Sequence, residues 1–172
     1  MTPPPPGHAR SGIGYDSHRF AEGRRLVLGG VHIPSDRGLA GHSDADVLTH
    51  AIIDALLGAA GLGDIGQHFP DTDERFKDAD SLELLRTVVV FLEENGFRIV
   101  HVDATVMMER PKLAPYRDAM RETLSAALRI GLGHMTVKAT TGERMGFVGR
   151  GEGVAAMAIA TLDRPEELPS AP

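Results

Sequence analysis

One helix with an apolar face constrains the fold of this chain more than any other feature of its sequence. Between residues 43 and 61, apolar residues recur at intervals of three and four, which is the period of a helix with one buried side: Val47, Leu48, Ala51, Ile52, Ala55 and Leu56. Ser43, with Asp46 three residues later, is expected to cap this helix, and Gly61 to mark its end. A face of this kind must be buried, so the chain needs another layer packed against it.

The other predicted elements indicate that this second layer is a sheet. Strands are predicted at residues 12–20, 26–33, 97–108 and 135–142, and further helices at about 81–94 and 115–130. Gly29-Gly30 interrupts the second strand and is expected to form a turn or a bulge. The segment 151–162 is ambiguous, because its alanines favour a helix whereas its Val and Ile content is typical of a buried strand. This order of elements predicts an α+β protein with helices on one face of a sheet.

Length and composition narrow the class of protein. The chain has 172 residues, of which 42% are hydrophobic, and its formal net charge is −6. One domain is expected at residues 12–163, between a flexible Pro-rich tail at 1–11 and a C-terminal tail at 164–172. The acidic balance argues against nucleic acid as a partner. No apolar run is long enough for a membrane span and no signal peptide is recognisable, so a cytoplasmic protein is expected.

Asp16 and His18 lie two residues apart in the first predicted strand, so their side chains share one face of it. With His50 from the helix they make a set of two imidazoles and one carboxylate, which suits Zn²⁺ with an open fourth position. The chain has no cysteine, so a metal site must use such ligands. Asp46 or Asp54, four residues to either side of His50, is expected to bind its second ring nitrogen. A surface ion pair, a proton-transfer pair and a solvated helix stripe remain alternatives.

A long polar loop follows the apolar helix and is rich in carboxylates. Asp64, Asp71 and Asp73 are candidates to bind the hydroxyl groups of a polar ligand. Solvated turn residues are the plainer interpretation of the same composition.

The segment 138–153, "KATTGERMGFVGRGEG", combines five glycines with two threonines and Arg150. Exposed backbone amides, hydroxyls and a guanidinium suit a phosphate-binding loop, although the segment is not a P-loop. Glu143 is a candidate to hold a hard cation such as Mg²⁺ against phosphate oxygens. A Gly-rich turn between strands is the alternative.

Taken together, these segments resemble the family of 2-C-methyl-D-erythritol 2,4-cyclodiphosphate synthases of the non-mevalonate route to isoprenoids. The resemblance covers about residues 12–162 and rests on "GYDSHRF", "LGGVHIP", "GLAGHSDADVLTHAIIDALLGAAGLGDIGQHFPDTD", "RPKLAPY" and "VKATTGERMGFVGRGEG". It implies a ferredoxin-like α+β two-layer sandwich in which the helices lie on one face of a mixed sheet and the final apolar segment is a strand. It also implies that residues 12–163 are a catalytic domain and that the chain forms a homotrimer with active sites at subunit interfaces.

The resemblance implies roles for particular residues as well. One Zn²⁺ per subunit is expected on Asp16, His18 and His50, and Mg²⁺ or Mn²⁺ with the substrate diphosphate on Glu143. Substrate contacts near the zinc are expected from His42, Ser43, Asp64, Ile65, Gly66, Asp71 and Asp73. The neighbouring subunit is expected to supply the cytidine pocket with Met108, Lys112, Leu113, Thr140 and Thr141. Phe147 and Arg150 are expected near the trimer axis and the phosphates, and His42 and Thr141 are expected to stabilise charge during catalysis.

The implied reaction converts 4-diphosphocytidyl-2-C-methyl-D-erythritol 2-phosphate to the cyclic diphosphate and releases CMP. Gly142 stands where the family often has a third hydroxyl residue, and Glu109 and Arg110 replace less charged residues, so the nucleotide loop and the pocket rim are expected to differ. A zinc-dependent phosphohydrolase is one alternative. A trimer that binds a prenyl diphosphate in an axial cavity, lined by Tyr15, Phe147 and Arg150, is another.

Overall fold

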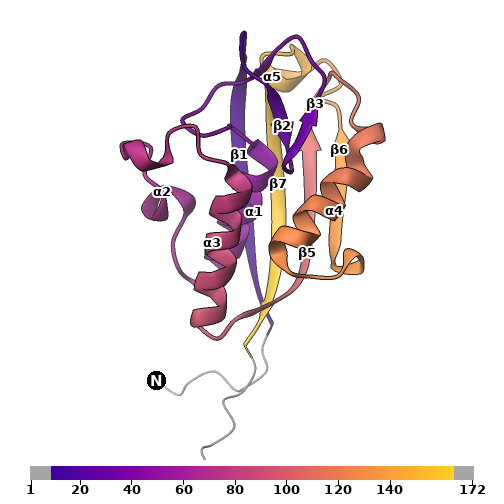
Figure 1. Cartoon of the computed structure of the whole chain (residues 1–172). Helices are drawn as coiled ribbons and strands as arrows, with labels where there is room; N and C mark the ends of the chain where they lie inside the picture. The colour runs from indigo at the N-terminus through magenta and orange to yellow at the C-terminus, as the bar shows by residue number, and fades with distance from the viewer. Residues whose placement is uncertain (1–8, 165–172) are drawn as a thin grey trace, which may run out of the picture.

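A five-stranded sheet forms the back of the molecule and helices cover one of its faces (Figure 1), in a computed structural model that describes residues 9–164. The strand order across the sheet is β4-β1-β7-β5-β6. The bounds of these strands are β1 Arg10–Ala21, β4 Gly38–Leu39, β5 Arg98–Met107, β6 Met135–Thr140 and β7 Gly153–Asp163. Neighbouring strands are antiparallel except β5 and β6, so the sheet is mixed. The predicted α+β fold is confirmed.

Five α-helices and a separate hairpin complete the described fold. The helices are α1 Val47–Ala60, α2 Ile65–His68, α3 Ser81–Glu94, α4 Arg117–Leu128 and α5 Gly146–Gly149. Short 3₁₀ turns occupy η1 Glu74–Phe76, η2 Ala114–Tyr116 and η3 Leu132–His134. The hairpin joins β2 Leu26–Leu28 to β3 Val31–Ile33. Within residues 9–164 there is no helix whose length and apolar content would allow it to cross a bilayer.

The segment of ambiguous sequence is the central strand of the sheet. β7 pairs with β1 along one edge and with β5 along the other, and its side chains from Val154 to Leu162 alternate between the core and the open face. Alanines suit this position because α1 packs directly over β7. The strand assignment that the family resemblance implied is therefore confirmed.

Small residues allow α1 to lie very close to β1. A Cβ atom added to Gly14 would lie 1.9 Å from the carbonyl oxygen of Ala51, and one added to Gly12 would lie 2.2 Å from that of Ala55. No side chain fits in such a space, so these two glycines set the distance between strand and helix. The close approach brings the polar residues of β1 next to His50.

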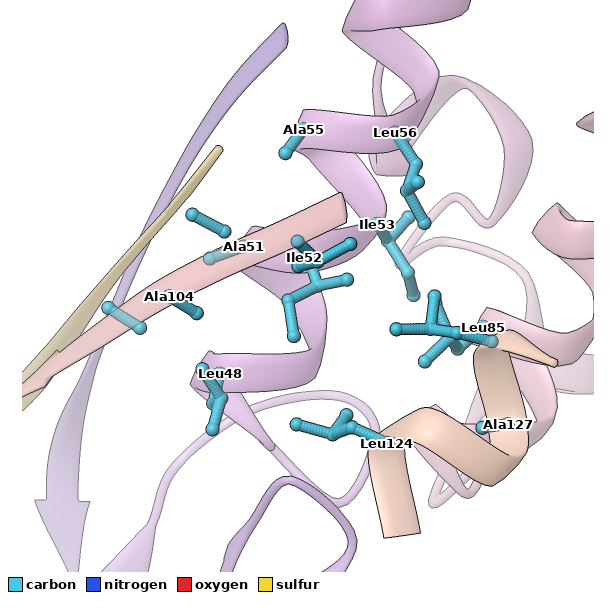
Figure 2. Packing of buried hydrophobic residues seen from close by; sticks show 14 of the residues in the cluster. Leu48, Ala51, Ile52, Ile53, Ala55, Leu56, Leu85, Ala104, Leu124 and Ala127 are labelled. Atoms are coloured by element: carbon cyan, nitrogen blue, oxygen red, sulfur yellow. The ribbon is translucent and has the colours of Figure 1, made fainter. Parts of the chain in front are cut away.

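Helix α1 lies at the centre of the core and is buried on nearly every side (Figure 2). Leu48 and Ile52 pack toward the sheet and α4, while Ile53 packs toward Leu85 of α3, and all four side chains are fully buried. The sequence predicted one apolar stripe on this helix. The structure buries a second side because α3 packs against α1.

Several predicted boundaries need correction. Helix α1 begins at Val47, and Asp46 itself is its N-cap, because its carboxylate accepts the backbone N–H of Thr49. Ser43 instead accepts the N–H of Ala45 in the preceding loop. The third predicted helix starts and stops two residues inside its expected range, at 117–128. The predicted break at Gly29-Gly30 is confirmed as a turn, because residues 26–33 form a hairpin that turns at these two glycines of positive φ.

The predicted tails lie mostly outside the described residues, which exclude 1–8 and 165–172. The N-terminal tail was expected to extend to residue 11, but β1 already begins at Arg10. Antiparallel pairing of Arg10 with Leu162 of β7 extends the strand to this point.

The other face of the sheet carries exposed apolar side chains on its two central antiparallel strands. Ile13 and Tyr15 of β1 lie directly opposite Ile159 and Met157 of β7, and the four are between 41% and 65% exposed. Exposed apolar side chains that form one contiguous patch mark an interaction surface.

Candidate metal centre and ligand cavity

Asp16, His18 and His50 meet where β1 passes over α1. The Oδ2 atom of Asp16 lies 2.9 Å from Nε2 of His18 and 3.0 Å from Nδ1 of His50. The two ring nitrogens lie 3.3 Å apart. One ligand atom from each residue falls within 4.8 Å of the other two, which is the spacing of groups that share one metal ion.

Ring orientation makes both histidines suitable ligands. Nδ1 of His18 donates to the carbonyl oxygen of Ala40 over 2.6 Å, so its Nε2 faces Asp16 with a free lone pair. His50 presents the opposite nitrogen, Nδ1, to the same point, and its Nε2 lies 2.8 Å from Oγ of Ser81. Two imidazoles and one carboxylate that converge in this way fit a divalent ion such as Zn²⁺.

The expected partners of the second nitrogen of His50 are wrong. Asp46 is fully buried and accepts hydrogen bonds from the N–H groups of Gly29 and Gly30, besides those of the first turn of α1. Asp54 accepts the N–H of Ile65 at the start of α2. Free N–H groups at helix starts attract both carboxylates, because Asp46 caps α1 and Asp54 binds the first N–H of α2, so the spacing of four misled the prediction.

Charge interactions shift two pKa values in the triad. Burial raises the pKa of Asp16, but hydrogen bonds and charge from His18 and His50 outweigh it and hold the pKa of Asp16 well below its usual range. Burial lowers the pKa of His18, and the hydrogen bond and charge of Asp16 overcome this and raise it. The triad thus keeps an ionised carboxylate in place at any pH near neutrality.

A cavity of about 460 Å³ opens beside the triad. It contains a group of the predicted substrate residues: His42, Ser43, Ile65, Gly66 and Asp71. Phe69, Pro70, Phe76 and Leu84 form an apolar wall that the sequence did not predict as part of a site. Spaced apolar residues carry no chemical signal in a sequence, so only the fold could show that they line a cavity.

The other two predicted carboxylates of the loop are engaged locally. Asp64 caps α2 and accepts from the N–H and side-chain amide of Gln67, and Asp73 binds the guanidinium of Arg75. The hydrogen bonds of Arg75 lower the pKa of Asp73. Neither lines the 460 Å³ cavity, although the carbonyl oxygen of Asp73 accepts from His42.

A second group of predicted residues gathers at the far edge of the sheet. A hollow of about 160 Å³ is lined by Met108, Lys112, Leu113, Thr140 and Thr141. An adjoining hollow of about 550 Å³ is lined, among other residues, by Lys112, Arg110, Thr141, Glu143, Arg144 and Arg150. Phe147 does not line it and is 37% exposed on α5. In this second hollow, the hydroxyl of Thr141 donates to Glu143 over 2.5 Å, and Arg150 pairs with Glu152. Basic side chains beside hydroxyls are suited to phosphate groups.

Thr140 of the second group is well separated from the metal ligands of β1. One row across the sheet joins Ser17, Ala155, Met107 and Thr140. Thr140 is therefore three strand spacings, about 14 Å, from β1. Side chains alternate along a strand, so Asp16 and His18 point to the face opposite to that of Ser17 and Thr140.

Comparison with known proteins identifies the family. The model of the YgbB family matches residues 9–163, which is nearly the whole described chain. The chain belongs to the YgbB family. The sequence is 56% identical over 154 residues to the 2-C-methyl-D-erythritol 2,4-cyclodiphosphate synthase of Chlorobaculum tepidum, covering 90% of this chain and 98% of that one. It is 61% identical over 153 residues to the enzyme of the same name from Salinibacter ruber, covering 89% and 98%.

A solved structure supports the same membership in the YgbB family. The structure of a 2C-methyl-D-erythritol-2,4-cyclodiphosphate synthase in a form bound to CDP is similar, with a TM-score of 0.83 and 40% identity. The alignment covers 90% of this chain and all of that one. The family resemblance predicted from the motifs is confirmed, and the protein is an enzyme of this family.

Proposed function

We propose that this protein converts 4-diphosphocytidyl-2-C-methyl-D-erythritol 2-phosphate to 2-C-methyl-D-erythritol 2,4-cyclodiphosphate and CMP, in the non-mevalonate route to isoprenoid precursors. The observation that carries the proposal is the convergence of Asp16, His18 and His50 beside a cavity that contains the predicted substrate residues. High identity to synthases of this name over nearly the whole chain supports it.

The reaction is an intramolecular phosphoryl transfer. An oxygen of the 2-phosphate attacks the β-phosphorus of the diphosphate, and the bond from that phosphorus to the oxygen bridging it to the α-phosphate breaks. The electron pair of that bond leaves with CMP. A phosphate oxygen is already nucleophilic, so the task of the protein is to hold two anionic groups together.

Residues of the cavity are suited to hold the methylerythritol end of the substrate. His42 and Ser43 lie on the cavity wall beside the triad, where they can donate to phosphate oxygens. Ile65, Gly66 and Asp71, which also line the cavity, are proposed to contact its hydroxyls and carbon chain, with Asp64 and Asp73 on the same loop.

The residues at the far edge are proposed to bind the cytidine diphosphate end. Met108 and Leu113 are buried beneath the 160 Å³ hollow, while Lys112, Thr140 and Thr141 offer polar groups at its surface. Thr141 is also proposed to stabilise the charge that develops on CMP. The structure of a synthase with bound CDP supports a cytidine ligand of this kind.

Two metal ions complete the proposal. Zn²⁺ on Asp16, His18 and His50, one per subunit, and Mg²⁺ or Mn²⁺ on Glu143 would, when bound, polarise phosphate oxygens and neutralise their charge. Glu143 is exposed and already accepts from Thr141, so its carboxylate is oriented toward the proposed phosphate hollow.

We further propose that the protein is a cytoplasmic homotrimer with active sites between subunits, and that it binds neither nucleic acid nor membrane. Thr140 of one chain points to the sheet face opposite to that of Asp16 and His18. We therefore propose that a complete site uses the nucleotide residues of a second copy. A ferredoxin-like two-layer sandwich, with helices on one face only, leaves the apolar patch of Ile13, Tyr15, Met157 and Ile159 for that contact. In a closed ring, Phe147 and Arg150 are expected near the axis.

Phosphorus NMR tests the reaction directly. The purified protein with the cytidyl substrate, Zn²⁺ and Mg²⁺ is expected to yield CMP and a cyclic diphosphate, and His50→Ala is expected to yield neither. CMP with a linear phosphate would instead identify a zinc-dependent phosphohydrolase. A metal-loaded protein without turnover would contradict the synthase, and the prenyl-diphosphate-binding trimer would then be tested by ligand screening.

Light scattering tests the assembly. The native protein is expected at three times the mass of one chain, and Ile159→Asp on the open sheet face is expected to give monomers without activity that still bind zinc. Buried charge at an apolar interface destabilises association. A variant that stays trimeric would place the interface elsewhere.

A further inference from the structure

The ring nitrogen of His50 that faces away from the triad contacts Ser81, which the sequence predicted only as the start of a helix. His50 is 8% exposed, and its Nε2 lies 2.8 Å from Oγ of Ser81, the first residue of α3. Ser81 is fully buried. The contact joins α1 to α3 directly behind the triad.

Asp44 fixes the direction of this hydrogen bond. The hydroxyl of Ser81 donates to Oδ1 of Asp44 over 2.5 Å, and its backbone N–H donates to Oδ2 over 3.1 Å. A serine hydroxyl has a single hydrogen, and here the carboxylate receives it. Oγ of Ser81 is therefore left as an acceptor, and Nε2 of His50 must be the donor.

A second serine offers the opposite arrangement. Oγ of Ser43 lies 3.2 Å from Nε2 of His50 and accepts the N–H of Ala45, so its own hydrogen is free to be donated to the ring. That donation would place the proton of His50 on Nδ1, the nitrogen that faces Asp16 and His18. The contact with Ser81 is shorter and ends on a carboxylate, so it is the stronger of the two.

We propose that Ser81 and Asp44 are positioning residues that keep the proton of His50 on Nε2, so that the Nδ1 lone pair points to Asp16 and His18. The hydrogen-bond chain runs from Nε2–H of His50 to Oγ of Ser81 and from its hydroxyl to Asp44. In the same way, the carbonyl oxygen of Ala40 accepts the Nδ1–H of His18 and leaves its Nε2 free to face Asp16. The proposal rests on the metal role of the triad in the proposed function.

The same hydrogen-bond chain also connects α1, α3 and the loop before α1 to the triad. Asp44 accepts the N–H of Asp46, the N-cap of α1, and its own N–H donates to the carbonyl oxygen of Ala79 just before α3. The positions of α1 and α3 relative to each other therefore determine whether the ring of His50 is oriented for a metal. Hydrogen bonds of this kind behind a ligand commonly change metal affinity by about 10–100-fold.

Zinc affinity, measured by competition with a chromophoric chelator, tests the proposal without the reaction. Ser81→Ala is expected to raise the zinc Kd by about 10–100-fold, and Asp44→Ala by a similar factor. The matched control is Ser125→Ala, which removes the hydroxyl of another buried serine, on α4, that has no hydrogen-bond partner among the described residues. The control is expected to leave the zinc Kd within about twofold of the native protein.

The double variant separates positioning from general support of the fold. If Asp44 acts through Ser81, Asp44→Ala is expected to change the zinc Kd by no more than about twofold in the Ser81→Ala background. If the effects of the two substitutions on the zinc Kd were fully additive, the proposed hydrogen-bond chain would be overturned, because Asp44 would then act through the loop alone. An unchanged zinc Kd in Ser81→Ala would also overturn it.

Nitrogen-15 NMR of the zinc-loaded native protein tests the same point without any variant. A hydrogen-bonded, buried Nε2–H of His50 is expected to give a proton signal protected from exchange with water. Its absence in the native protein would overturn the proposal, even if Ser81→Ala failed to fold. If the native protein binds zinc and shows the Nε2–H signal of His50 but forms no product, the result would count against the proposed reaction and not against the role of Ser81.

Discussion

The side chains of the metal centre are held by neighbours of their own chain, whereas most polar side chains of the proposed nucleotide site are exposed. His50 is 8% exposed, and the second ring nitrogen of each histidine has a hydrogen-bond partner within the fold. Glu143 and Arg150 are exposed, and their side-chain partners are short local contacts with Thr141 and Glu152.

The difference indicates that the two regions depend on different levels of structure. The metal centre is complete once β1, α1 and α3 pack, because all its contacts lie within one copy. The nucleotide residues are proposed to act together with the metal centre of a second copy. Each of the following variants is designed to disturb one region and spare the other.

Gly14→Ala is expected to have the largest effect and to remove the metal centre. Its Cβ would lie 1.9 Å from the carbonyl oxygen of Ala51, so β1 and α1 must move apart. Overpacking of this kind costs about 1–3 kcal/mol or more, and the ligands of β1 would no longer meet His50. Thermal melting and zinc titration are expected to show a clear loss of both stability and affinity.

Gly58→Ala is the matched control within α1. An added Cβ there meets only the carbonyl oxygen of Ile13, at 4.0 Å. The substitution is expected to be neutral or to stabilise the helix by up to about 1 kcal/mol. Normal zinc binding by Gly14→Ala would contradict the view that this contact builds the centre.

Mixing two inactive variants is expected to restore activity. His50→Ala lacks the metal centre, and a Thr141→Ala/Glu143→Ala double variant lacks the nucleotide site. In trimers reassembled from equal amounts, about a quarter of the sites would combine two intact halves, so about a quarter of native activity is expected. No recovery after verified subunit exchange would show that both halves of the site come from one chain.

Glu143→Gln is expected to affect the nucleotide region alone. Loss of the negative charge is expected to raise the Mg²⁺ concentration needed for half-maximal activity by about tenfold. The zinc Kd is expected to stay unchanged, because the hollow that Glu143 lines includes none of the three metal ligands. A parallel loss of zinc affinity would mean that the two regions are coupled within one copy.

The smallest effect is expected from pH on the metal-free protein. The pKa of His18 is raised above its usual 6.5, so its charged form stabilises the fold below that pH and this stabilisation is lost as pH rises through the folded-state pKa. The pKa of Asp16 is lowered, so its contribution to the stability of the fold is present above its usual pKa of 3.8 and stays constant between pH 6 and pH 8.5. The melting temperature is expected to fall by about 2–4 °C between pH 6 and pH 8.5.

Asp16→Asn should reduce that fall, because the charge that raises the pKa of His18 is gone. A melting temperature that rises over the same range in the native metal-free protein would contradict the assignment. Scanning calorimetry at several pH values, with a chelator present, makes the comparison.

Local patterns in the sequence were enough to predict several features of the fold and the site. The alternation of strands placed Asp16 and His18 on one face, and the period of the helix marked the buried side of α1. Residue type and spacing suggested a metal centre among other roles, and the family resemblance implied the same three ligands. The strand assignment of β7 came only from family resemblance, since alanine-rich segments suit both kinds of element.

Other features were decided by the tertiary structure, because they depend on contacts between segments far apart in the chain. Asp44 and Ser81 are 37 positions apart, and no local period connects them to His50. Asp46 was assigned to His50 by helical spacing, but in the structure it binds the hairpin and the first turn of α1. Spacing in a sequence determines which side chains share a face, whereas packing of the elements determines what each face meets.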